Sequence, residues 1–103
     1  MIDPELVLLG LNYLYGCHPY SNVSFITDIG VNTKNVSYGN NRADYTVIPG
    51  GVVPGLLLLA PDYMENKDDY PFLWGENECC TNSIPNYVML SLASEEVADA
   101  LNK

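Results

Sequence analysis

The chain has 103 residues, which is enough for one domain and too few for two. Hydrophobic residues make up 48% of it and charged residues 17%, which is the composition of a segment that packs a core. The formal net charge of −9 argues against a nucleic acid or an anionic membrane as a partner, because phosphate groups bind to basic surfaces. The longest apolar stretch, residues 52–60, is interrupted by Pro54 and Gly55 and is far shorter than the roughly 20 residues that cross a bilayer.

A first helix is predicted to begin at residues 3–5. Asp3 is a capping residue, Pro4 suits the first helical position, and Glu5 places a carboxylate where the helix dipole favours it. Residues 6–14 are broadly apolar, and Gly16 is predicted to end the helix. We expect this helix to be mostly buried.

A long loop region is predicted for residues 17–51, with one short strand where residues 23–29 alternate in polarity. Loops of this length in compact domains usually carry function, so the region indicates a binding surface. Residues 56–59 read as a short buried run. Residues 61–71 are acidic and aromatic and are expected at the surface.

A second long helix is predicted for residues 83–101, where Pro85 fits the first turn and apolar residues follow helical spacing. It is expected to be a core helix. Each of the two helices has more hydrophobic surface than the other can cover. We therefore expect further packing partners in a longer parent chain, and self-association when the chain is alone.

Four sequence blocks resemble one enzyme family in their order and spacing. They are LNYLYGCHPY at 11–20, SFITDIG at 24–30, VPG at 53–55 followed by the Pro-Asp pair at 61–62, and DDY at 68–70 leading to NE at 77–78. In family 9 glycoside hydrolases, similar blocks form the penultimate helix and its following loop, a proline-glycine loop and a terminal signature. The resemblance covers nearly the whole chain.

The resemblance implies a mainly α fold, an (α/α)6 barrel of six helical hairpins. Residues 1–103 would form a single partial domain: the last hairpin or so of that barrel, plus its long loops. The implied activity is inverting hydrolysis of a β-linked polysaccharide or oligosaccharide in a secreted or periplasmic parent enzyme, without a cofactor. The implied partners are the carbohydrate substrate and the remainder of the catalytic domain.

The resemblance also implies that Glu78 is the catalytic acid. Apolar surroundings, including Trp74, would keep its carboxyl protonated for donation to the leaving group. Inverting chemistry needs a second carboxylate, about 6.5–9.5 Å away, to activate water. In the family that base is an Asp from an N-terminal motif, and nothing in this chain matches it.

Candidate substrate contacts surround the predicted acid. Trp74 and Tyr70 are the preferred sugar-stacking platforms, because a pyranose packs its apolar face on an aromatic ring. Arg42 stands where the family carries histidines and an arginine, and the missing histidines leave room for a glycan other than cellulose. Asn77 is a candidate to orient Glu78 or to bind a sugar hydroxyl, with a turn or capping role as its alternative. Further candidate platforms are Tyr38, Tyr45 and Tyr63.

Other interpretations of the same residues stay open. His18 stands where the family carries Asn, and a lone His without a partner nearby in sequence favours a structural role. If residues 76–78 are extended, Glu76 and Glu78 point the same way and could bind a cation with Asp68 or Asp69. The chain as a whole could also be a glycan-binding or interaction module without catalysis, or an inactive truncated fragment.

Overall fold

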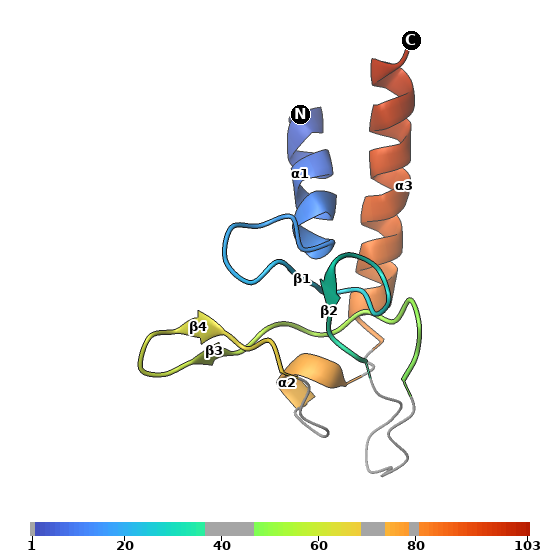
Figure 1. Cartoon of the computed structure of the whole chain (residues 1–103). Coiled ribbons are helices and arrows are strands. Elements are labelled where there is room, and N and C mark those ends of the chain that lie inside the picture. Colours follow the sequence, from blue (N-terminus) through green and yellow to red (C-terminus); the bar gives the residue numbers. More distant parts are fainter. Residues whose placement is uncertain (1, 37–46, 69–73, 79–80) are drawn as a thin grey trace.

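The computed structural model describes residues 2–36, 47–68, 74–78 and 81–103. Within these residues the helices are α1 (Pro4–Leu14), α2 (Trp74–Asn77) and α3 (Ser83–Leu101). In the same ranges, β1 (Val23–Ser24) pairs with β2 (Asn32–Thr33), and β3 (Leu58–Leu59) pairs with β4 (Met64–Glu65). Figure 1 shows α1 and α3 side by side, with the strands and α2 gathered at the end where α3 begins.

The start and end of α1 follow the sequence signals. The Asp3 carboxylate accepts a hydrogen bond from the Glu5 N–H at 3.0 Å, and Pro4 is the first helical residue. The helix ends two residues before Gly16, which has a left-handed φ of 86°. A Cβ at Gly16 would lie 2.7 Å from the Asn22 carbonyl oxygen, so this turn needs glycine.

The two long helices run antiparallel, and both chain termini lie at the same end of the pair (Figure 1). They approach closely at Gly10, where a Cβ would lie 3.8 Å from the methyl carbons of Leu90. The hydroxyls of Tyr15 and Tyr87 are hydrogen-bonded at 2.9 Å. The prediction that both helices are mostly buried is wrong: α1 has no buried residue, and Ser94 alone is buried in α3.

The physical reason is that two paired helices cover only one face of each other. Large apolar side chains are exposed along both of them: Leu6, Leu9, Tyr13, Ile84, Val88, Met89, Leu92 and Leu101. The apolar pattern identified the helices correctly. It did not show how much of that surface this chain itself covers.

The hydrophobic core lies in the predicted loop region, residues 17–51, and directly after it. Among the described residues its members are Val23, Ile26, Val36, Val52 and Val53. β1 and β2 pair in parallel, and Ile26 forms an antiparallel bridge with Val52. The predicted strand over 23–29 shrinks to two residues, because the chain beyond it bonds to residues 51–53 instead of β2. The Thr27 N–H donates to the Gly51 carbonyl at 2.9 Å, and the Val53 N–H donates to the Phe25 carbonyl at 2.8 Å.

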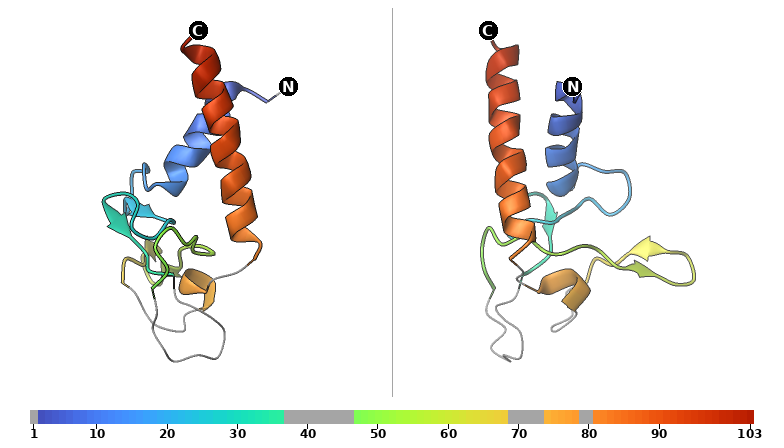
Figure 2. Two further views of the ribbon diagram at one scale, coloured as in Figure 1. Left: turned by 90° about the vertical axis from the view of Figure 1, so that its right-hand side faces the viewer. Right: turned by 180° about the vertical axis from the view of Figure 1, so that it is seen from behind.

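β3 and β4 form an antiparallel hairpin that projects away from the helix pair (Figure 2). The prediction of a buried run at 56–59 is wrong, since Leu58 and Leu59 are 58% and 45% exposed. Their strand pairs with β4 at the surface instead of entering the core. The surface prediction for 61–71 holds along the described residues 61–68, except that Asn66 is fully buried and Glu65 is half-buried.

The (α/α)6 barrel stays a prediction, since the described residues contain one antiparallel pair of long helices and two small sheets. None of the helices in the described ranges has the length and hydropathy of a membrane-spanning segment.

Candidate functional site

The predicted site residues are distributed around α2. Glu78 directly follows this helix and is half-buried, while Asn77, its last residue, is only 4% exposed. Trp74 begins α2, and its side chain lies outside the described part of the structure. Arg42 and Tyr70 also lie outside the described residues. The burial of Asn77 favours the structural interpretation of this residue over a direct contact with a sugar.

A buried ion pair anchors α2. The Lys34 ammonium lies 3.3 Å from Glu76 Oε2, and both side chains are almost completely buried. Glu76 Oε2 also accepts a hydrogen bond from the Asn66 side-chain amide at 2.7 Å, and Oε1 accepts one from the Leu57 N–H at 2.9 Å. The Lys34 ammonium also donates to the backbone carbonyl of Asp68.

This arrangement satisfies the conditions under which a buried ion pair is tolerated. Taking two charges out of water is costly, and the cost is offset only when the remaining donors and acceptors are also satisfied. Glu76 receives donors from three separate segments: Lys34 after β2, Leu57 before β3, and Asn66 after β4. These bonds fix α2 against both sheets and thereby fix the chain two residues before Glu78.

The cation alternative depends on an extended segment, and residues 74–77 are helical instead. Glu76 lies within this helix and points inward, whereas Glu78 follows the helix and is partly exposed. The inward carboxylate is paired with Lys34. Across the part of the chain that the structure describes, no group of three or more His, Cys, Asp or Glu residues could hold a metal ion. Asp69 lies outside that part.

A second polar cluster joins the loop after α1 to β4. Glu65 Oε2 accepts a hydrogen bond from the Ser21 N–H at 3.2 Å and a second one from the Ser21 hydroxyl. His18 Nδ1 lies 3.6 Å from the same carboxylate oxygen. The Ser21 hydroxyl donates to a carboxylate and not to the imidazole, so the cluster is not arranged as a serine nucleophile with a histidine base.

The predicted structural role of His18 agrees with its surroundings. Its side chain is buried, its ring lies 5.0 Å from the ring of Tyr13, and Nε2 is 3.2 Å from the Val23 carbonyl oxygen. A carbonyl oxygen only accepts, so Nε2 carries the hydrogen of this bond. His18 thus ties the end of α1 to β1.

Sequence reasoning missed Lys34, Glu76, Ser21 and Glu65. Lys34 lies in a polar segment, where lysine is usually solvated, and nothing in its neighbourhood signals burial. For Glu76 the sequence predicts only a cation site shared with Glu78, which needs an extended segment. The helix at residues 74–77 and the burial of Glu76 rule out that arrangement.

Comparison of the chain with protein-family models, with curated proteins and with solved structures found no match.

Proposed function

We propose that this chain is the C-terminal part of an inverting glycoside hydrolase and that Glu78 is its general acid. The observation that carries the proposal is the anchoring of α2. The buried carboxylate of Glu76 bonds to three segments, and Glu78 leaves the end of this fixed helix only half-buried. A general acid needs such a position, because its carboxyl must keep a fixed direction while remaining within reach of a substrate.

In this proposal, the protonated Glu78 carboxyl donates its proton to the glycosidic oxygen as the bond to the anomeric carbon breaks. A water molecule attacks that carbon from the opposite face and loses a proton to the catalytic base, so the anomeric configuration inverts. The base belongs to a segment outside this chain. Arg42, Trp74 and Tyr70 are proposed substrate contacts, while the burial of Asn77 favours a structural role for this residue.

The exposed faces of α1 and α3 support the same proposal. Both helices expose large apolar side chains along their length, as at Leu9 and Met89, which are 54% and 68% exposed. Contiguous apolar surface of this kind marks an interaction site. We propose that the remaining hairpins of the catalytic domain cover these faces and that the complete enzyme acts outside the cell on a polysaccharide.

The test is a hydrolysis assay with the chain joined to the rest of its catalytic domain. Glu78→Gln is expected to lower kcat on a β-linked glucan by about 10²- to 10⁴-fold, the usual contribution of a general acid. Glu95→Gln, which alters an exposed glutamate of α3, serves as the matched control and should leave kcat unchanged. An unaffected Glu78→Gln variant, or a first-formed product with retained configuration, would remove Glu78 from the proposed role.

A further inference from the structure

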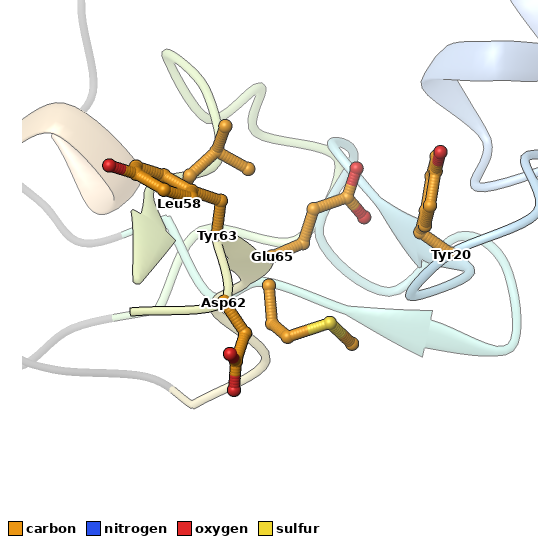
Figure 3. A pocket seen from close by; sticks show the side chains of 6 residues that line it. Tyr20, Leu58, Asp62, Tyr63 and Glu65 are labelled. Atoms are coloured by element: carbon orange, nitrogen blue, oxygen red, sulfur yellow. The ribbon is translucent and has the colours of Figure 1, made fainter. Parts of the chain in front are cut away.

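A pocket lies between the β3–β4 hairpin and the loop that follows α1, formed by other elements than α2. Its volume is about 400 Å³, and it is lined by Tyr20, Leu58, Asp62, Tyr63, Met64 and Glu65. Pockets that hold small ligands usually measure about 300–1,000 Å³. Figure 3 shows Tyr63 and Tyr20 on opposite sides, with the Glu65 carboxylate between them.

The two tyrosines are exposed to a degree that packing does not explain. Tyr20 is 74% exposed and Tyr63 is 69% exposed. Tyr63 also has a left-handed φ of 55°, which is disfavoured for a bulky residue. Such strain persists where the surrounding structure imposes it, and it gathers at ligand-binding positions. The folded chain therefore holds an exposed ring in a conformation that asparagine or glycine would adopt more easily.

Glu65 lines the pocket and joins β4 to the loop after α1 through its hydrogen bonds with Ser21. Both bonds from Ser21 go to Oε2, and among the described residues no hydrogen bond reaches Oε1. The Glu65 side chain retains 13% exposure. One carboxylate oxygen is thus fixed to the loop after α1, and the other keeps its acceptor capacity in a pocket that Tyr20 and Tyr63 also line.

We propose that this pocket binds one sugar unit of a neutral β-linked glucan, separately from the bond cleavage at Glu78. Tyr20 and Tyr63 contact the apolar faces of the pyranose, and Glu65 Oε1 accepts a hydrogen bond from a ring hydroxyl. Asp62 and Glu65 put negative charge at the site, and the chain carries a net charge of −9, so sulfated and uronic-acid sugars are rejected. The choice of glucan as ligand rests on the proposed function.

The test titrates the 103-residue chain with cellohexaose by calorimetry and maps the contact by amide chemical shifts. The shifts are expected at residues 58–65 and at Tyr20. Tyr63→Asn removes the ring and introduces a residue that tolerates the left-handed backbone. The Kd for cellohexaose should therefore rise by about tenfold or more. Tyr63→Phe keeps the ring and should bind within about threefold of the original chain. Asn102→Ala, an exposed change beyond the end of α3, is the control and should bind unchanged.

A stability measurement separates binding from folding. Tyr63→Asn should unfold at the same temperature as the original chain or at a higher one, because asparagine relieves the disfavoured backbone conformation. Its affinity for the ligand should fall all the same. Unchanged affinity of Tyr63→Asn would overturn the proposal. A hexamer of anionic β-linked glucuronic acid that binds as tightly as cellohexaose would also overturn it, because the negative charge at the pocket should reject that ligand.

The outcome is independent of catalysis. In Glu78→Gln, cellohexaose should still shift the amides of Tyr20 and residues 58–65 as in the original chain, while the complete domain loses hydrolysis. Cellohexaose binding at the tyrosines in a chain whose Glu78 proves non-catalytic would uphold the pocket and remove the proposed function. Hydrolysis that depends on Glu78, with no binding at the tyrosines, would uphold the proposed function and remove the pocket.

Discussion

At the scale of single residues, the ion pair of Lys34 and Glu76 links the fold to the candidate site. Neither side chain reaches water, and each has further polar partners. A buried charge that keeps all its partners is tolerated, whereas one that loses its counter-charge is strongly destabilising. The pair therefore makes the position of Glu78 depend on residues that touch no substrate.

Removal of one member of this pair should be costly. We expect Glu76→Gln to lower the free energy of unfolding by about 3–5 kcal/mol, because Lys34 then stays buried without a counter-charge. Urea denaturation followed by circular dichroism measures the change. Glu95→Gln, an exposed control with the same chemical change, should stay within about 0.5 kcal/mol.

A double variant tests whether the cost comes from the pair itself. In Lys34→Met with Glu76→Gln, no unpaired charge remains, and the amide oxygen can still accept from one of the two donors, Leu57 or Asn66. Its loss of stability should be smaller than the sum of the two single losses. Strictly additive losses would show that the two residues do not interact as their 3.3 Å separation indicates.

The hydrogen-bonded pair Tyr15 and Tyr87, between α1 and α3, predicts that the free energy of unfolding depends on pH in the alkaline range. Burial raises the pKa of Tyr15, and the hydrogen bond to Tyr87 and the charge of that residue raise it further. The folded chain then keeps a proton that the unfolded chain loses near the ordinary pKa of about 10. The titration of Tyr15 should leave the free energy of unfolding unchanged in the neutral range, and this free energy should fall as pH rises through 10 toward the raised pKa.

Tyr15→Phe isolates this effect from other alkaline titrations. At pH 7 the variant should be less stable by about 1 kcal/mol, the usual net value of one hydrogen bond. Above pH 10 the difference in free energy of unfolding between the two chains should narrow. The original chain then loses the stability that comes from Tyr15, and the variant has no such contribution to lose. Denaturation curves at several pH values measure it, and a difference that widens with pH would contradict the assigned direction.

At the scale of secondary-structure elements, local signals determined the two long helices. Asp3 and Pro4 fixed the start of α1, and apolar spacing after Pro85 predicted α3 over the range that the structure shows. The β3–β4 hairpin was not predictable in this way. Four consecutive leucines read equally well as a buried run, and their exposure depends on β4, which lies several residues further along.

The core was unpredictable for a related reason. It joins Val23 and Ile26 to Val52 and Val53 across a long stretch of sequence, and periodicity reports only local structure. The candidate site was unpredictable for the same reason. The burial of Glu76 in α2 depends on Lys34, which is 42 residues away in the sequence.

The hairpin should depend on Glu65 more than the helices do. Glu65→Ala removes both hydrogen bonds from Ser21, so the amides of residues 58–65 should exchange with solvent about tenfold faster. Amides of α1 and α3 should be unaffected. Hydrogen exchange measured by mass spectrometry reads both regions in one experiment. Equal acceleration in the helices would mean that the bond stabilises the whole fold and not the hairpin.

At the scale of the whole molecule, the exposed apolar faces of α1 and α3 predict self-association of the isolated chain. Sedimentation velocity should show a mass that increases with concentration. Met89→Lys and Leu92→Lys, which place charge on the exposed face of α3, should shift the chain toward monomer. Asn102→Lys adds the same charge beyond the helix and should not. A monomer at every concentration would contradict the prediction.

The assignment of Glu78 as general acid is tested most directly by the dependence of Glu78→Gln on the leaving group, measured in the complete catalytic domain. Cleavage of an unactivated glucan needs proton donation to the leaving group. An aryl glycoside of an acidic phenol does not, because the phenolate leaves without being protonated. We predict a loss in kcat/KM of about 10²- to 10⁴-fold on the glucan and of less than about tenfold on the aryl glycoside. Equal losses on both substrates would show that Glu78 is not the acid.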